Sequence, residues 1–483
     1  MISYQLPIGS RNRRLSLIDN KFAKFWLNRY NCTNEKGESY MNLLNQKITV
    51  VKERLKEEFL TDTRPWVVTF SGGKDSTTVL HLVIEMLLDM RKEGVKDSKK
   101  VYIVSSDTGV EMPLIEDYVS NKLAEISSFA KKENLNVTVN LLKPKVTDSF
   151  WTLLLGKGYP SPNQTFRWCT DRMKIRPATH FLKSLSDKNE SILMLLGVRS
   201  DESASRAASI EKREDNHRGF SMHPDIPNAF VYSPIKDWTN GEVWTFLSEK
   251  KAPWGKHDDM MVLYDKGSGE GDCNIALNPE SQSCGKTRFG CWTCTVVSKD
   301  KSMANMLMNE SDQWMKPLHD FRNLLDDYRD PQKLGKEKRQ PRRRNGQKSI
   351  GPFKLQTRKE LLEKLFETEQ SLKEDLAGKT LISNEEIIQV QSEWLNDGDF
   401  FDSAIKLANK YNRNIECESV KSFNEYEQEY IQSMCEDNGI NKELIDHIMQ
   451  CEHSYRHHSI RAKAFGEFET IIERFAKGQL NEV

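Results

Sequence analysis

The sequence predicts an α/β fold with a doubly wound, mostly parallel sheet, followed by a cysteine-rich loop and a helical C-terminal domain. Short β-branched runs alternate with longer apolar-periodic segments over residues 66–250, which is the pattern of strands covered by helices on both faces. Four cysteines then fall within one polar stretch, and helical periodicity dominates beyond Phe353. We expect an N-terminal extension at 1–42, the α/β domain at 43–260, the cysteine loop at 261–300, a linker with a basic stretch at 301–355 and the helical domain at 356–483.

The composition limits which environments and partners suit the chain. Its 71 basic and 71 acidic residues balance, so binding to nucleic acid would need a local patch. No apolar run approaches the ~20 residues of a membrane helix, and no signal-peptide core is evident. We therefore expect no membrane contact and a reducing cytoplasm, where the nine cysteines indicate metal ligands, catalytic thiols or core residues rather than disulfides.

The first strand and helix of the α/β domain flank a glycine turn. Val67 to Phe70 predicts a buried strand, and an apolar-periodic helix continues to about Leu87. Glycines let backbone N–H groups approach an anion, and a helix N-terminus favours negative charge. A Walker A loop needs Ser or Thr directly after its lysine, whereas Asp75 follows here. We expect a phosphate cradle made of Ser71, Gly72, Gly73, Lys74, Asp75 and Ser76.

The next strand ends in a second polar turn. Residues 101–104 predict this strand, which leads into Asp107, Thr108 and Gly109. A helix is expected from Pro113 to about residue 132, and a third strand at 137–142. Parallel strands present their carboxyl ends at one edge of the sheet, so one ligand can reach both turns. Asp107 is therefore predicted to contact a nucleotide or Mg²⁺.

Two further segments carry clustered cations. Arg167, Arg172, Lys174 and Arg176 surround Cys169 in sequence, and this pattern predicts a positive pocket that lowers the thiol pKa. A strand at 192–196 is followed by Arg199 and, seven residues later, by Arg206.

Taken together, these motifs resemble a known family. Ser-Gly-Gly-Lys-Asp-Ser resembles the PP-loop of ATP pyrophosphatases, which cleave ATP between the α- and β-phosphates. The D-T-G turn, the R-x-C…R-x-K-x-x-P segment, the G-x-R-x-x-E-S…R turn and the P-I-x-D-W segment resemble the phosphoadenosine phosphosulfate (PAPS) reductase family in the same order. The resemblance implies bound ATP, with catalytic roles for Lys74, Asp75, Lys174, Arg199 and Arg206. The Glu-Cys-Gly-Leu segment of the reductases is missing, which argues against sulfate reduction.

The cysteine loop has the spacing of a metal site. Cys273, Cys284, Cys291 and Cys294 lie in a Gly-, Ser- and Asn-rich stretch that ends in Cys-x-x-Cys. Four thiolates around one centre can hold either zinc or an iron–sulfur cluster, and spacing alone does not distinguish the two.

A reductase-like domain followed by this loop and a basic helical tail is similar to the DndC family of DNA sulfur-modification proteins. That family replaces a non-bridging oxygen of a DNA phosphate with sulfur, and the similarity implies a [4Fe–4S] cluster on the four cysteines. It also implies a cysteine desulfurase as sulfur donor and other DNA-phosphorothioation proteins as partners. Cys169 would either carry a persulfide or be a structural thiol. The related single-strand phosphorothioation protein SspD is a neighbouring alternative.

The C-terminal third adds a basic stretch and several helices. Residues 333–348 predict a flexible cationic loop, which we expect to contact DNA phosphates. Helical patterns occupy residues 357–367, 384–395, 426–435, 442–449 and 459–475.

The sequence therefore predicts an ATP-dependent DNA sulfurtransferase that activates a backbone phosphate by adenylylation. Three alternatives stay open: a tRNA thiolation enzyme, a sulfonucleotide (PAPS or APS) reductase, and an ATP-gated DNA-binding scaffold without turnover.

Overall fold

The computed structural model describes residues 40–95, 99–188, 191–202, 219–224, 226–268, 289–344, 347–399, 402–416, 425–455 and 462–479. Most of the expected N-terminal extension lies outside these ranges. No helix in the described ranges combines the length and the apolar character needed to cross a membrane.

A six-stranded sheet organises the first half of the chain, in the order β3-β2-β1-β4-β6-β5. All strand pairs are parallel except β5 with β6, so the expected doubly wound, mostly parallel sheet is confirmed. Strands β5 and β6 have no counterpart in the sequence prediction. The strands are β1 (Trp66–Thr69), β2 (Val101–Ser106), β3 (Val137–Leu142), β4 (Ile192–Leu195), β5 (Ser221–Met222) and β6 (Ala229–Tyr232).

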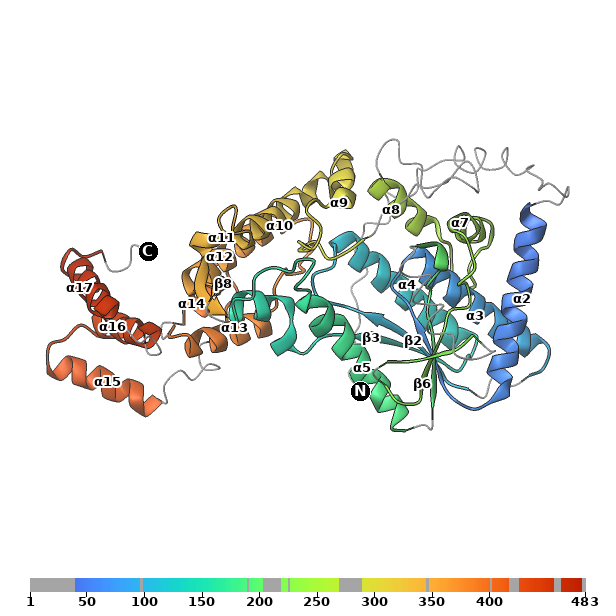
Figure 1. Ribbon diagram of the computed structural model, residues 1–483, viewed down its shortest axis with the longest axis horizontal. Coiled ribbons are helices and arrows are strands. Elements are labelled where there is room, and N and C mark those ends of the chain that lie inside the picture. Colours follow the sequence, from blue (N-terminus) through green and yellow to red (C-terminus); the bar gives the residue numbers. More distant parts are fainter. Residues whose placement is uncertain are drawn as a thin grey trace.

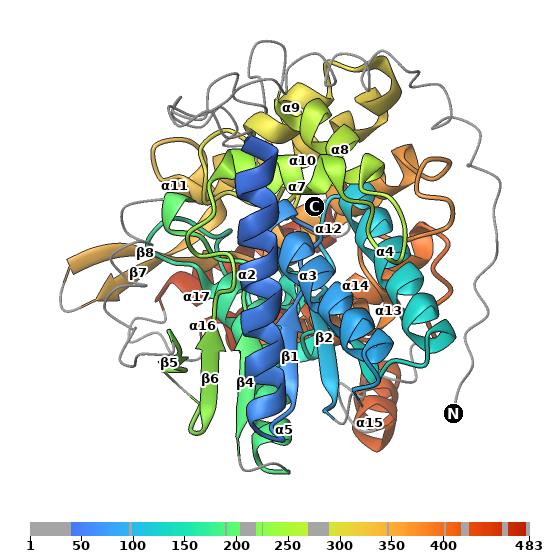
Figure 2. The same cartoon turned by 90° about the vertical axis from the view of Figure 1, so that its right-hand side faces the viewer.

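Helices cover both faces of this sheet because its side chains alternate between two cores. Trp66 and Val68 of β1 belong to the core formed with α2, α3, α4 and α7, whereas Val67 belongs to a second core with α5. Figure 2 shows α2 and α3 lying over one face of the sheet. These helices are α2 (Tyr40–Thr61), α3 (Lys74–Lys92), α4 (Pro113–Lys132), α5 (Arg176–Ser186) and α7 (Asn240–Glu249).

A separate apolar core joins segments that are far apart in the sequence. It combines Trp151 and Trp168 of the 146–175 segment with Trp292 of the cysteine loop and Trp394 of the helical part. Residues 301–355, expected as a linker, form helices that contribute buried side chains to this core. The remaining helices between residues 146 and 410, some of which contribute to this core, are η1 (Val146–Asp148), η2 (Thr152–Gly156), η3 (Thr170–Ile175), η4 (Ser200–Glu202), α8 (Asp258–Ser268), α9 (Lys301–Met306), η5 (Glu310–Met315), α10 (Lys316–Arg329), α12 (Leu355–Ser371), α13 (Asn384–Asn396) and α14 (Ser403–Lys410).

The basic stretch is not a flexible loop, so that part of the prediction is wrong. It forms the short helix α11 (Gly335–Lys338) and an antiparallel hairpin of β7 (Arg339–Arg344) with β8 (Gln347–Phe353). Arg339 fixes the base of the hairpin, since its guanidinium donates to the carbonyl oxygens of Arg329 at 2.9 Å and Gly351 at 2.8 Å. The two strands are consecutive in the sequence, and the Asn345-Gly346 pair between them was an available hairpin signal that the prediction from charge did not use.

Three further helices extend from the helical part: α15 (Glu425–Asp437), α16 (Lys442–Tyr455) and α17 (Ala462–Ala476). Figure 1 shows them at the end of the molecule opposite the sheet. Their surfaces remain open, with Phe465 65% exposed and Tyr430 58% exposed.

Removing one buried indole should weaken the attachment of the helical part. Trp394 is fully buried, and its Nε1 donates to the carbonyl oxygen of Leu155 at 2.7 Å. In Trp394→Phe this buried carbonyl loses its partner, so we expect the free energy of unfolding to fall by about 1–3 kcal/mol. Chemical denaturation measures the change. Trp314→Phe is the control, because Trp314 is only half-buried, and equal effects of the two substitutions would contradict the prediction.

Candidate functional site

The glycine turn after β1 places the N-terminus of α3 at the carboxyl end of the sheet. Gly73 precedes the helix and has no side chain with which to cap it, and the Tyr264 hydroxyl lies 3.5 Å from the Lys74 N. The Ser76 hydroxyl instead stabilises the turn, accepting from the Ser71 N–H at 3.2 Å and donating to the Gly73 carbonyl at 3.0 Å. The first N–H groups of α3 are therefore available to an anion, and the helix dipole favours negative charge there.

Two glycines allow the close packing on which this turn depends. Gly72 has φ +73°, a conformation that L side chains rarely adopt, and a Cβ there would lie 2.6 Å from Val119. Gly197 follows β4, and a Cβ on it would lie 2.6 Å from the backbone of Asp75 and Ser76. Contact with backbone cannot be relieved by turning a side chain, so only glycine fits behind the turn at position 197.

A charge network holds the start of α3. Arg199 is 2% exposed, and its Nε donates to Asp75 Oδ1 at 2.6 Å. Its Nη1 bonds Asp201 and the Trp238 carbonyl. Lys74 Nζ lies 3.1 Å from the other Asp75 oxygen, Oδ2. The structure thus places the Arg199 guanidinium behind the turn, where it orients Asp75.

The second turn lies beside the first. Asp107 accepts from the Gly109 N–H at 2.8 Å and pairs with Lys143 at 3.0 Å. The Thr108 hydroxyl donates to Glu111 Oε1 at 2.7 Å and lies 3.5 Å from Cys291 Sγ. Burial raises the pKa of the Glu111 carboxyl, although the hydroxyl of Thr108 partly counters this effect.

A cavity of about 560 Å³ joins these features. Both turns face it: Ser71 to Ser76 from one side and Asp107 from the other. Lys174 and Cys291 line the same cavity, as do Tyr264 and Phe289. The glycine turn and Asp107, which the sequence predicted to be within reach of one ligand, thus line one cavity. Lys174 and Cys291, which that prediction did not include, line it as well. Thr108, Gly109, Arg199, Cys169 and Cys294 do not line the cavity.

The cysteine pair forms a tight turn at this cavity. The Cys294 N–H donates to the Cys291 carbonyl at 3.0 Å, which closes the turn. Cys291 pairs with Glu111 in an isolated antiparallel bridge, and the neighbouring Trp292 N–H donates to the Val110 carbonyl at 3.0 Å. Burial raises the pKa of the Cys291 thiol to about 12.

The prediction for the pKa of Cys169 is wrong in direction. Burial raises the pKa of this thiol, and the electrostatic effect of Cys294 raises it further. The neighbouring cations do not compensate, because Arg172 pairs with Asp148 at 2.8 Å and Arg176 pairs with Asp171 at 3.0 Å. The influence of Cys294 also shows that Cys169, distant in sequence, lies near the Cys-x-x-Cys turn.

Two of the four predicted metal ligands, Cys291 and Cys294, belong to the part of the chain that the structure describes. Cys273, Cys284 and Arg206 lie outside the described residues. Within the described ranges, no three His, Cys, Asp or Glu side chains converge on a metal position. Thr293, between Cys291 and Cys294, is fully buried, and its Oγ1 has no hydrogen-bond partner among the described residues. An unsatisfied donor between two half-buried cysteines of a closed turn suits an anionic sulfur centre.

Two cavity residues were missed by sequence reasoning. Glu111 stands four residues after Asp107, and its acidic character in a post-strand loop was an available signal. Tyr264 comes from α8, and its hydroxyl lies 3.5 Å from the backbone N of Lys74. Nothing local in the sequence indicates that α8 packs against the glycine turn.

Comparisons with known proteins concern mainly the first part of the chain. Residues 65–297 match the phosphoadenosine phosphosulfate reductase domain family. An uncharacterised protein of Methanocaldococcus jannaschii is 25% identical over 282 residues, which cover 58% of this chain and 45% of that protein. The chain thus spans less than half the length of that relative.

Two further similarities cover about half of the chain. Sulfate adenylyltransferase subunit 2 of Methylobacterium nodulans is 21% identical over 296 residues, covering 55% of this chain and 84% of that protein. The structure of the U34-tRNA thiolase NcsA from Methanococcus maripaludis, with its [4Fe-4S] cluster, aligns at 10% identity and a TM-score of 0.28. That alignment covers 58% of this chain and 78% of the thiolase.

A methyl group at position 197 should displace the glycine turn. In Gly197→Ala the new Cβ meets the Asp75–Ser76 backbone, so we expect a stability loss of about 1–3 kcal/mol and weaker ATP binding. Calorimetric titration with a non-hydrolysable ATP analogue measures the affinity. Gly466→Ala is the matched control, since its Cβ meets nothing within 4 Å. Unchanged affinity in Gly197→Ala would show that the turn does not bind the nucleotide.

Proposed function

We propose that this chain, in which residues 65–297 form a PAPS reductase-like PP-loop domain, is an ATP-dependent sulfurtransferase acting on DNA. The observation that carries the proposal is the cavity that joins the N-terminus of α3 to Cys291 of the Cys-x-x-Cys turn. Adenylylation of the DNA phosphate and its attack by sulfur can then take place in the same cavity.

In this proposal, ATP lies with its pyrophosphate on the Ser71–Ser76 turn. The N–H groups of α3 and the Lys74 ammonium neutralise charge on the β- and γ-phosphates, and Lys174 faces the α-phosphate from the opposite wall. Mg²⁺ would be held by the Asp107 carboxylate and would supply further neutralisation. Arg199 contributes indirectly, by fixing Asp75 and with it the first turn of α3.

The chemistry then follows from the need for a better leaving group. A non-bridging oxygen of a DNA phosphate attacks the α-phosphorus of ATP and releases pyrophosphate. The attacking oxygen of the DNA phosphate now bridges the DNA phosphorus and AMP. When its bond to the DNA phosphorus breaks, it leaves as part of AMP and not as oxide. A thiol reductant releases hydrosulfide from the persulfide of a cysteine desulfurase and is itself oxidised to a disulfide. The hydrosulfide attacks the DNA phosphorus, and the products are a phosphorothioate, AMP and a proton.

The cysteines would hold the [4Fe–4S] cluster, which contributes sulfur or redox chemistry when bound. Cys291 and Cys294 supply two ligands, and Cys273 and Cys284 are the other candidates from the sequence. Cys169 fits a place beside this centre better than it fits a persulfide carrier, because its raised pKa disfavours a free thiolate.

DNA contact is assigned to the β7–β8 hairpin and the short helix α11 before it. The base of the hairpin is fixed to the helical part by Arg339, while Arg342 and Lys336 are exposed. Cationic side chains presented on a rigid ribbon suit phosphate contacts that do not depend on sequence.

A second candidate, sulfonucleotide chemistry, is favoured by the family match and by the similarity to a sulfate adenylyltransferase subunit. It would use the same cavity with a sulfate-bearing nucleotide. Sulfite release from PAPS, without any change to DNA, would identify it.

The products of ATP cleavage test the proposed activity. With DNA and a sulfur donor under anaerobic conditions, we expect AMP and pyrophosphate in equal amounts and phosphorothioate linkages in the DNA. Lys74→Ala should lower the rate by about 10²–10³-fold, because one charge-stabilising group is removed. Lys56→Ala is the control, as Lys56 pairs with Glu93 on the outer face of α3. Formation of ADP and phosphate instead would refute the mechanism.

Salt dependence tests the hairpin. In Arg342→Gln/Lys336→Gln we expect weaker DNA binding, and the slope of log K against log salt should fall by about 0.9 for each DNA phosphate that is no longer neutralised. Fluorescence anisotropy over a salt series measures this slope. Lys131→Gln/Lys132→Gln removes two exposed charges from the end of α4 and should leave the slope unchanged. Equal slopes for wild type and the hairpin variant would exclude this surface.

A further inference from the structure

The buried guanidinium of Arg322 donates hydrogen bonds to backbone carbonyls at the end of the Cys-x-x-Cys turn and just after it. Arg322 lies on α10 and is 1% exposed. Its Nε donates to the Cys294 carbonyl at 2.9 Å, and its Nη1 donates to the Ser298 carbonyl at 3.1 Å. The remaining bonds go to the Val297 carbonyl and the side-chain oxygen of Asn323. Arg322 thus fixes the position of Cys294 from the helical side.

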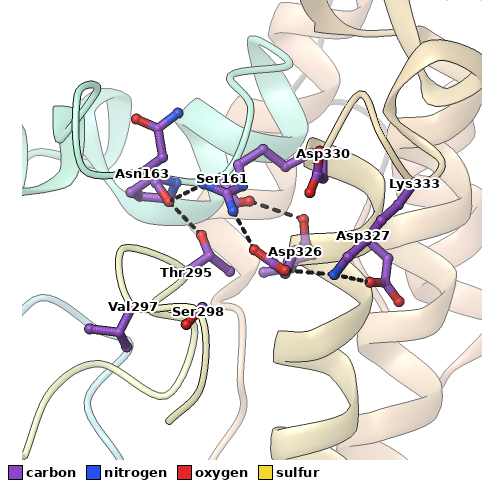
Figure 3. Close-up of polar contacts among 12 residues, drawn as sticks. Ser161, Asn163, Thr295, Val297, Ser298, Asp326, Asp327, Asp330 and Lys333 are labelled. Atoms are coloured by element: carbon purple, nitrogen blue, oxygen red, sulfur yellow. Dashed lines mark hydrogen bonds and ion pairs between the residues drawn. The ribbon is translucent and has the colours of Figure 1, made fainter.

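These bonds satisfy the donors of Arg322 without neutralising its charge. A guanidinium keeps its charge in proteins, and every acceptor here is an uncharged oxygen. The carboxylates of α10 are engaged elsewhere. Asp320 pairs with Lys316 at 2.6 Å, and Asp326 pairs with Arg329. Asp326 and Asp327 also pair with Lys333, at 2.9 and 2.6 Å (Figure 3). No carboxylate in the described ranges pairs with Arg322. A buried charge of this kind requires an opposite charge nearby.

A second, independent observation lies on the other side of Cys294. The buried Thr293 hydroxyl has no partner among the described residues, whereas the Thr295 hydroxyl, two residues further on, donates to the Pro162 carbonyl at 2.6 Å (Figure 3). Buried hydroxyls are nearly always hydrogen-bonded. A guanidinium with no directly paired carboxylate and an unsatisfied hydroxyl therefore flank the same cysteine, and an anionic acceptor suits both.

We propose that Arg322 and Thr293 are the positioning residues of a metal–thiolate centre at the Cys291–Cys294 turn, with Arg322 as its counter-charge and the Thr293 hydroxyl as a donor to one of its sulfur atoms. The inference rests on the cysteine centre of the proposed function. Cysteine binds a metal as a negatively charged thiolate, so Cys291 and Cys294 would supply the anionic acceptor. Neither residue lines the nucleotide cavity.

Two properties of the centre should depend on these residues. Hydrogen bonds to sulfur and nearby positive charge stabilise the reduced state of an iron–sulfur centre and raise its midpoint potential. Groups that orient metal ligands also support metal affinity, typically by a factor of about 10–100. Zinc is redox-silent, so metal affinity remains the readout if the centre holds zinc.

The charge of Arg322 can be separated from its hydrogen bonds by two substitutions. Arg322→Met removes both, and Arg322→Lys keeps the charge but loses the planar fork of donors. We expect Arg322→Met to lose metal to a chelator at least about tenfold more readily than wild type and, with iron, to have a more negative midpoint potential. Arg322→Lys should retain the wild-type potential. A purely structural role would instead make both variants less stable with equal, unshifted potentials.

Thr293→Val and Thr293→Ser form a matched pair of variants, without and with the hydroxyl. They test the inference even if the Arg322 variants fail to fold. In metal-free protein, Val should be neutral or stabilising, because it removes an unsatisfied buried hydroxyl. In metal-loaded protein, Val should lower metal retention and the midpoint potential, while Ser should preserve both. Anaerobic metal analysis, potentiometric titration and denaturation of both forms provide the measurements.

The outcomes distinguish this inference from the proposal on which it rests. A wild-type chain that binds neither iron nor zinc overturns both. A wild-type chain that binds metal, with Arg322→Met and Thr293→Val unchanged in metal retention and potential, overturns only the roles of Arg322 and Thr293. Loss of metal in Thr293→Val but not in Thr293→Ser, with ATP affinity unchanged in both, supports them.

Discussion

The site depends on one short backbone bridge between two distant parts of the chain. The bridge between Glu111 and Cys291, with the Trp292 N–H on the Val110 carbonyl, joins the turn after β2 to the Cys-x-x-Cys turn. Backbone pairing sets this separation independently of side-chain rotamers, and the Thr108 hydroxyl extends the bridge to the Cys291 sulfur. Without this bridge, the cavity at the glycine turn could bind an anion but would have no cysteine thiol in its wall.

Apolar packing holds that bridge in place. Trp292 is 2% exposed and lies in one core with Trp151 of the 146–175 segment and Phe321 of α10. Indole rings bury large areas, so the packing of Trp292 holds the cysteine turn against this core. Arg322, which follows Phe321 on α10, donates to the backbone carbonyl of Cys294. The helical part therefore supports the cysteines directly, and the sheet supports the nucleotide turn.

The sequence was most informative where local chemistry decides the structure. Val67–Phe70 followed by two glycines and Lys74 predicts a strand, a turn and a helix N-terminus, and the structure has each of them in place. It was least informative where distant packing decides. The position of Tyr264 and the proximity of Cys169 to Cys294 both require tertiary contacts. The hairpin at Arg339–Phe353 was missed for another reason, since the prediction weighed the charge of this stretch and not its Asn345-Gly346 turn signal. The pKa of Cys169 was misjudged because counting cations along the chain ignores the carboxylates that pair with them.

The core that joins Trp151 and Trp292 to the helical part limits where the chain can be divided into domains. Because Trp151 and Trp292 pack with Phe366 and Trp394, the boundary near residue 300 marks a change of motif and not a place where the polypeptide can be divided. A fragment ending there would leave a large apolar surface facing water and the cysteine turn without support. Exchange of the helical part between homologous chains would therefore have to carry the 146–175 segment with it, so the two regions are expected to evolve as a single unit.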